Sequence, residues 1–118
     1  MAKVDILTFH SANNAGAVLQ AYGLVQALRN LGHRPTVVDY RPAAARRYYQ
    51  PPGWRRPFAF LRHPAGYVRK QTMRAAFERF RHEYLPLSRA YGSWDDLRKS
   101  PPPADCAICG SDQVWNIH

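Results

Sequence analysis

The chain has 118 residues, 46% of them apolar or aromatic, and its 17 lysines and arginines exceed its 8 acids to give a net charge of +9. This length allows at most one domain with a modest core, and the composition is globular, not disordered. No apolar run reaches about 18 residues, which argues against a transmembrane helix. Residues 4–9 are too short and contain an acid, so they are not a signal peptide. We therefore expect a cytoplasmic protein.

Most of the excess positive charge lies between Arg41 and Arg81. A basic surface favours anionic partners such as nucleic acid, lipid headgroups or phosphorylated substrates. A solvated helix face explains the same residues without any partner, so the charge alone leaves both interpretations open.

The two cysteines, Cys106 and Cys109, have a Cys-x-x-Cys spacing. Zinc requires four ligands, and the chain has no second cysteine pair. A redox pair needs a helix N-terminus to lower a thiol pKa, whereas these residues fall on a predicted strand, where positions three apart point to opposite faces. We therefore predict two buried structural thiols. The histidines other than His10 show no metal-like spacing, so no metal site is predicted.

The first predicted unit is a strand followed by a helix. Residues 4–9 form a short apolar run of the buried type, which the polar segment 11–16 interrupts. A helical period then begins at Ala17. Its apolar stripe consists of Val18, Ala21, Tyr22, Val25 and Leu28.

The ends of this helix carry typical signals. Asn13 or Asn14 is the expected N-cap, because a short amide side chain accepts from open backbone N–H groups, and Gly32 ends the helix. Residues 35–40 then form a second predicted strand. This β-α-β order predicts an α/β fold with a Rossmann-like parallel sheet and flanking helices.

A basic loop and a long helix follow. Residues 41–57 are rich in arginine, proline and tyrosine, which predicts a loop, and a helical turn is expected at 58–62. Residues 66–84 predict a long helix that Pro86 stops. Its apolar stripe consists of Met73, Ala76, Phe77, Phe80 and Tyr84, and basic residues from Arg69 to Arg81 occupy much of the remaining surface.

The last part of the chain predicts a short helix capped by Ser93, a rigid triple-proline spacer and a third strand over residues 105–109. In α/β proteins such a strand end is where ligands bind, and a helix normally follows to cover the sheet. The sequence reaches His118 soon afterwards. We therefore expect the front part of a larger enzyme.

Three segments in chain order carry a specific signal. They are residues 6–22 with the turn Asn13-Asn14-Ala15-Gly16, residues 37–42 with Asp39-Tyr40-Arg41-Pro42, and residues 110–116 with Gly110-Ser111-Asp112-Gln113. Together they resemble the opening, the second strand and the central strand end of the polysaccharide pyruvyl transferase family. Residues 43–100 match only in general character.

The resemblance implies an enzyme of the two-lobed GT-B type. It would transfer a pyruvyl group from phosphoenolpyruvate to two hydroxyls of a sugar in a cell-surface glycan or its precursor, forming a cyclic ketal. Family members are longer, so residues 1–118 would be a partial N-terminal Rossmann-like lobe that is inactive alone. Its expected partners are phosphoenolpyruvate as co-substrate, a sugar or lipid-linked glycan acceptor, and a missing C-terminal half or partner chain. No other cofactor is implied, and the family's phosphoenolpyruvate-binding basic residues match no position here.

Asn13, Asn14 and Gly16 are candidate substrate-binding residues. A strand-to-helix turn exposes backbone N–H groups at the positive end of a helix dipole, where a phosphate or a sugar hydroxyl can bind. Glycine lets a ligand approach the backbone closely. The alternative is a cap and a tight turn without any ligand.

Ser111, Asp112 and Gln113 are the second set of candidate substrate-binding residues. In a parallel sheet, the ends of the first and third predicted strands open on the same carboxyl edge, so Asp112 and Asn13 would line one cleft. Asp112 could act as the catalytic base that the attacking hydroxyls need, orient a sugar hydroxyl, or cap a following helix. Trp115 could stack on a sugar ring or belong to the core.

Two further features have alternative interpretations. His10 directly follows the first strand and is either a catalytic imidazole or a strand-end histidine satisfied by the backbone. The basic residues from Arg69 to Arg81 could attract a lipid-linked sugar phosphate and give peripheral contact with a membrane.

Two other functions compete with the transferase, which itself implies no specific nucleic-acid partner. A small nucleic-acid-binding module would use the basic helix with Tyr48, Tyr49 and Trp54 as stacking aromatics. The Asn-Asn-Ala-Gly turn would then have no purpose. The second competitor is a non-catalytic subunit whose sheet and cleft another protein completes.

Overall fold

The structure, a computed structural model, describes residues 1–43 and 59–110. Its elements are, in chain order, β1 (Lys3–Leu7), α1 (Ala15–Asn30), β2 (Arg34–Tyr40), α3 (Ala59–Arg62), α4 (Pro64–Tyr84), β3 (Leu87–Tyr91), α5 (Trp94–Lys99) and β4 (Cys106–Cys109). Within these residues the strands form one sheet in the order β3-β2-β1-β4, and each neighbouring pair is parallel. The predicted parallel α/β fold is therefore confirmed.

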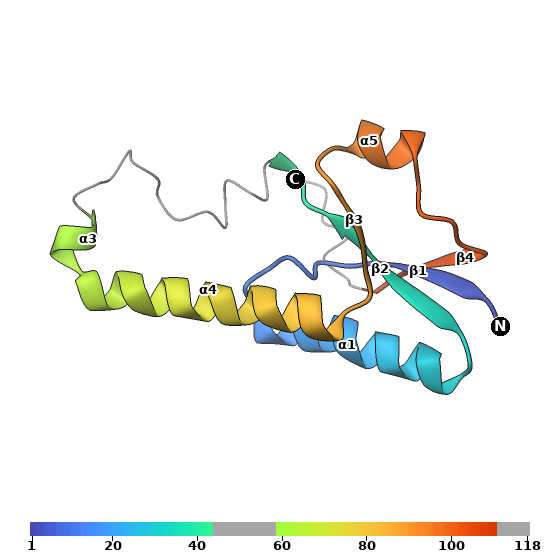
Figure 1. The fold of residues 1–118 in the computed structure, drawn as a ribbon, viewed down its shortest axis with the longest axis horizontal. Helices are drawn as coiled ribbons and strands as arrows, with labels where there is room; N and C mark the ends of the chain where they lie inside the picture. Colours follow the sequence, from blue (N-terminus) through green and yellow to red (C-terminus); the bar gives the residue numbers. More distant parts are fainter. Residues whose placement is uncertain (44–58, 111–118) are drawn as a thin grey trace.

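The helices divide between the two faces of the sheet. In Figure 1, α1 and α4 lie side by side on one face, and α5 lies on the other. Aromatic rings join the first two helices, since the ring centroid of Tyr22 on α1 lies 5.8 Å from that of Phe80 and 6.1 Å from that of Tyr84 on α4. This packing brings the C-terminal half of α4 against the part of the sheet that carries the site described below.

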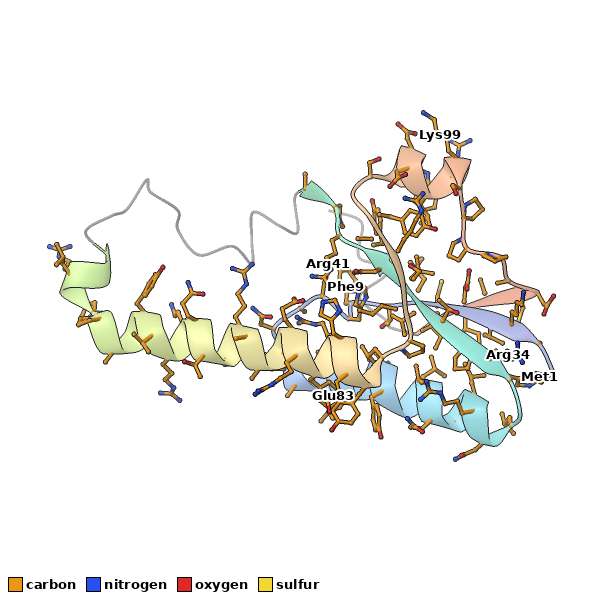
Figure 2. All side chains as sticks on the ribbon, in the orientation of Figure 1. Met1, Phe9, Arg34, Arg41, Glu83 and Lys99 are labelled. Atoms are coloured by element: carbon orange, nitrogen blue, oxygen red, sulfur yellow. The ribbon has the colours of Figure 1, made fainter. Side chains whose placement is uncertain are left out.

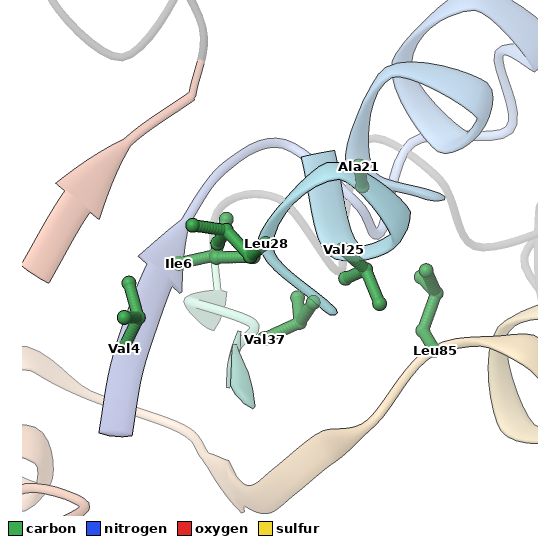
Figure 3. Close-up of a cluster of buried hydrophobic side chains, with 7 residues drawn as sticks. All are labelled: Val4, Ile6, Ala21, Val25, Leu28, Val37 and Leu85. Carbon is green, nitrogen blue, oxygen red and sulfur yellow. The ribbon is translucent and has the colours of Figure 1, made fainter. Parts of the chain in front are cut away.

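The hydrophobic core lies between the sheet and α1. Figure 3 shows seven of its side chains, which are Val4, Ile6, Ala21, Val25, Leu28, Val37 and Leu85. In a strand, alternate residues face the same side, so Val4 and Ile6 both point toward the helix. On α1 the buried positions fall on one helical stripe, as the sequence predicted.

A glycine, Gly32, ends α1 and begins the connection to β2. Gly32 has a φ of 82°, a left-handed conformation that an L side chain rarely adopts. Its N–H donates to Arg29 O over 2.9 Å, and the N–H of His33 donates to Leu28 O over 2.9 Å. These two bonds form a Schellman motif, which ends the helix where the sequence predicted.

Strand β3 was not predicted from the sequence. Its residues Leu87–Tyr91 include no β-branched side chain, and it lies at the edge of the sheet with an irregular register against β2. The strand predicted as the third is therefore β4, paired with β1. The predicted short helix is confirmed as α5, whose cap Ser93 accepts from the N–H of Asp96 over 3.1 Å.

The prediction of two buried thiols is wrong, because Cys106 and Cys109 are both exposed. Strand β4 is the last strand of the described sheet and pairs with β1 along one side, so its side chains have few neighbours. Among the described helices, α4 is the longest at 21 residues, and none is both long and apolar enough to cross a membrane.

Candidate functional site

The turn between β1 and α1 (residues 8–14, the β1–α1 turn) lies at the carboxyl edge of the sheet. Asn14 is the N-cap of α1, and its Oδ1 accepts from the N–H of Gly16 over 2.8 Å. A Cβ on Gly16 would stand 3.2 Å from that oxygen, so glycine allows the close approach. The structure thus resolves the alternative between Asn13 and Asn14 in favour of Asn14.

Arg81 of α4, the helix that packs beside α1, makes hydrogen bonds to this turn. Its side chain is fully buried, and its Nε donates to His10 O over 2.6 Å. Its Nη2 donates to Ala12 O over 2.6 Å and to Asn13 Oδ1 over 3.2 Å. The prediction that Arg81 belongs to an exposed basic face is therefore wrong: the helix turns this position toward the loop, where backbone carbonyls attract the cation.

The contacts with Arg81 and Gly16 fix the orientation of two amide groups. A guanidinium and a backbone N–H can only donate, so the atoms they contact in Asn13 and Asn14 must be the amide oxygens. The two NH₂ groups remain, and neither has an acceptor within the described part of the chain. The turn therefore presents side-chain donors beside the positive end of the α1 dipole.

His10 is fully buried between two acceptors. Its Nδ1 lies 3.2 Å from Thr8 O, and its Nε2 lies 2.9 Å from Oδ1 of Asp39 at the end of β2. Because a carbonyl and a carboxylate only accept, a ring nitrogen of His10 that carries a proton can donate to its neighbour. Of the two interpretations of His10, the structure favours a histidine held by its neighbours over an exposed catalytic group.

Asp39 connects His10 to a chain of charges. Burial opposes ionisation of its carboxyl group, but the hydrogen bonds from His10 and from Arg41 outweigh burial and lower its pKa to about 2. Arg41 Nε donates to Asp39 Oδ1 over 2.6 Å. Figure 2 shows Arg41 between the sheet and α4. The carboxyl group of Asp39 is therefore ionised at neutral pH.

Glu78 of α4 closes the chain of charges. Its Oε1 accepts from Arg41 Nη1 over 3.2 Å and from Arg81 Nη1 over 2.6 Å. We refer to the whole group as the charged network. It consists of His10, Asp39, Arg41, Glu78 and Arg81. Two carboxylates thus compensate two buried or half-buried guanidiniums, which meets the requirement that buried charges be paired.

The end of β4 reaches the same edge of the sheet. The N–H of Gly110 donates to Leu7 O over 3.0 Å, and its carbonyl accepts from the side-chain amide of Gln20 on α1. A Cβ on Gly110 would meet Leu24 Cδ2 at 3.2 Å, so the chain leaves β4 tightly against α1. The ends of β1 and β4 therefore open on the same carboxyl edge, as the sequence predicted, and the two strands are neighbours in the sheet.

Several predicted positions fall outside the described residues. They are Ser111, Asp112, Gln113 and Trp115 after β4, and Tyr48, Tyr49 and Trp54 in the predicted loop. Of residues 41–57, the structure describes the first three. Asn13, Asn14 and Gly16 are brought together at one edge, and Gly110, the last described residue, lies at the same edge.

The other described arginines of α4 do not join the charged network. Arg69 and Arg79 are exposed on α4, whereas Arg81 is buried two residues further on. Across the described residues, no group of three or more histidine, cysteine or acidic side chains could hold a metal ion.

Neither Glu78 nor Arg81 was predicted as a residue of the site, and Asp39 was predicted only as part of a family-like segment. The one local signal is the spacing of Glu78 and Arg81, which at three residues apart on a helix are neighbours. Their contact with the β1–α1 turn joins positions about 70 residues apart, which no helical period reveals.

The parallel sheet, with a donor-rich turn at its carboxyl edge, defines an α/β domain of the type that binds ligands at that edge. A family model described as polysaccharide pyruvyl transferase matches residues 14–118. The chain therefore belongs to the polysaccharide pyruvyl transferase family, which confirms the resemblance found in the sequence and suggests a transferase. No curated protein and no solved structure matches the chain.

Proposed function

We propose that the chain is part of a transferase that moves a pyruvyl group from phosphoenolpyruvate to a sugar of a cell-surface glycan or its precursor. The family match over residues 14–118 is the observation that carries this proposal. In this proposal residues 1–118 belong to the N-terminal lobe of a two-lobed GT-B-type enzyme, and residues 41–57 form a basic loop within that lobe. The reaction takes place in the cytoplasm, with phosphoenolpyruvate as co-substrate and no separate cofactor.

The chemistry sets requirements that the carboxyl edge can meet. Two sugar hydroxyls lose their protons and their oxygens bond to the central carbon of the pyruvyl group, while the bond from that carbon to the phosphate oxygen breaks. One proton converts the enol methylene to a methyl, and the other leaves with phosphate. The NH₂ groups of Asn13 and Asn14, beside the N-terminus of α1, suit an oxygen of phosphate or of a sugar hydroxyl. Gly16 keeps the backbone open to that oxygen.

Asp112 is the candidate for the general base, with Ser111 and Gln113 as neighbouring substrate-binding residues. A carboxylate can accept the proton that an attacking hydroxyl loses. Gly110 supports this assignment, because its contacts with Leu7 and Gln20 hold the residue before Ser111 at the carboxyl edge of the sheet. Orientation of a sugar hydroxyl is the alternative role of Asp112.

A second lobe, on the same or another chain, completes the cleft in this proposal, because the basic residues that bind phosphoenolpyruvate in the family match none of the residues here. The first lobe alone is then inactive. A lipid-linked acceptor would bring the enzyme to a membrane surface, where the exposed arginines of α4 could contact anionic headgroups.

A genetic complementation experiment tests the proposal. Deletion of the coding sequence in its host should remove acid-labile pyruvate ketals from the purified surface glycan, which proton NMR detects through the ketal methyl group. The wild-type sequence should restore them, and Asn30→Ala, at the exposed far end of α1, should do the same. Asp112→Asn and Asn13→Ala should restore few or none. Unchanged ketal content in the deletion strain would reject the proposed reaction.

A further inference from the structure

We propose that Arg81 is a positioning residue, which holds the β1–α1 turn in the shape that presents the amide of Asn13. The contacts of Arg81 are sufficient to support its role in holding the turn. That this position of the Asn13 amide helps substrate binding rests on the proposed function. Arg81 lies at the end of α4, 68 residues from Asn13 along the chain, and neither the family match nor the motifs assign it a role.

The turn needs an outside partner for its backbone. Strand β1 ends at Leu7 and α1 begins at Ala15, so the carbonyls of His10 and Ala12 belong to neither ladder. His10 and Ala12 are buried, and a buried carbonyl without a partner is costly. Arg81 donates to both of these carbonyls, over 2.6 Å each. The guanidinium therefore supplies what a neighbouring strand would otherwise provide.

Two elements, α4 and β2, contact the turn at the same time. The carbonyl of His10 accepts from Arg81 of α4, while its ring contacts Asp39 of β2. Glu78 connects these two sets of contacts, because its Oε1 accepts from both Arg41 and Arg81. The turn consequently moves only if contacts with the sheet and with α4 are lost together.

Lysine cannot replace the arginine here. The acceptors Ala12 O, His10 O and Asn13 Oδ1 surround the planar fork of Arg81, which reaches them from two different nitrogens. A lysine carries a single nitrogen on a flexible stem, so it cannot reproduce that arrangement. Without the donor from Arg81, the amide of Asn13 is free to rotate and to offer its oxygen in place of its NH₂ group.

Amide hydrogen exchange of the purified chain, followed by NMR, tests this role. Arg81→Lys and Arg81→Met remove charge-assisted hydrogen bonds to the carbonyls of His10 and Ala12, so the β1–α1 turn should open more often. Exchange of its N–H groups should therefore become about tenfold faster or more. Exchange at Ile6 and Val37 in the core should change much less. Arg79→Lys is the matched control, since Arg79 is exposed on the same helix. Equal acceleration in turn and core, or none in the turn, would overturn the proposal.

Two further readouts keep the test decisive. In the unaltered chain, the Nε proton of Arg81 should exchange slowly with water and show a nuclear Overhauser contact to the turn, so a rapidly exchanging proton would overturn the proposal even if both variants fail to fold. In the complementation strain, Arg81→Lys should lower ketal content while protein abundance stays constant, and Arg79→Lys should not. If deletion of the gene leaves the ketals intact, the proposed reaction fails, whereas the exchange result still decides the role of Arg81.

Discussion

Nε2 of His10 lies 2.9 Å from Oδ1 of Asp39, and both side chains are buried at the carboxyl edge of the sheet. This contact joins the turn after β1 to the end of β2, and Arg41 adds a second donor to the same oxygen over 2.6 Å. The carboxylate is thus stabilised inside the protein by the groups around it, and this has consequences for stability that can be measured.

Asp39 should make stability depend on pH in the acid range. Its folded pKa of about 2 lies below the ordinary value of 3.8, so the stabilisation is fully present above about pH 4 and is lost as the pH falls toward 2. The shift corresponds to a free energy on the order of 2 kcal/mol. Urea denaturation between pH 2 and 7 should show a shallower acid dependence for Asp39→Asn than for wild type. Asp95→Asn, on exposed α5, should keep the wild-type slope; equal slopes for all three proteins would contradict the assignment.

Loss of the imidazole should destabilise the fold. His10→Gln removes one of the two side-chain donors to the buried carboxylate of Asp39 and the ring contact with the carbonyl of Thr8, and we expect a decrease in the free energy of unfolding of about 1–3 kcal/mol. His82→Gln provides the comparison, since this histidine is 69% exposed, and its change should stay within about 0.5 kcal/mol. Urea denaturation at pH 7 measures both. Similar values for the two variants would mean that the buried contact contributes little.

Asn14 should combine two functions that substitution can separate. Asn14→Ala removes the cap of α1 and should cost about 1 kcal/mol of stability. Asn14→Ser restores a capping oxygen but not the NH₂ donor, so its thermal midpoint should approach that of wild type. In the complementation strain, both variants should give low ketal content. Full ketal content with Asn14→Ser would show that the NH₂ group takes no part.

The glycines at positions 23 and 110 should respond in opposite directions to alanine. A Cβ at Gly23 meets nothing within 4 Å in the exposed middle of α1, so Gly23→Ala should stabilise by about 0.5–1 kcal/mol. A Cβ at Gly110 would press against Leu24 at 3.2 Å and displace the end of β4. Thermal unfolding should therefore give a higher midpoint for the first variant and a lower one for the second. Equal shifts would contradict the tight packing of β4 on α1.

The core should behave as a packed interior. Ile6 is fully buried between the sheet and α1, and Ile6→Ala should cost about 2–5 kcal/mol. Leu19, on the same helix as the core residue Val18, is 57% exposed, so Leu19→Ala should cost far less. Denaturant titration compares the two variants directly, and a similar loss for both would argue against the described core.

The elements with a strong local pattern could be predicted from the sequence. The period of α1, its ending at Gly32 and the cap at Ser93 depend on neighbouring residues, and the structure confirms all three. β3 was missed because its side chains carry no strand pattern, and it exists because β2 offers an open edge to pair with. Tertiary context decided that element, not local propensity.

The candidate site was predictable in part. The turn with Asn13 and Asn14 follows from a strand-to-helix boundary, which the sequence marks clearly. Arg81 was assigned to the solvent because arginines are rarely buried unless they are paired. Its partners are backbone carbonyls of a turn and Glu78, and such pairing depends on how α4 docks against the sheet. No local pattern in a single sequence predicts how α4 packs against the sheet.

Transfer of an isotopic label from phosphoenolpyruvate to the glycan tests whether this protein belongs to a pyruvyl transferase. Phosphoenolpyruvate labelled with ¹³C in its methylene carbon would be added to an extract of host cells, together with their own glycan precursors. We predict that labelled ketal methyl groups appear on the glycan, that deletion of the gene abolishes them, and that the wild-type gene restores them. Undiminished labelling in the deletion extract would contradict a pyruvyl transferase role for this protein.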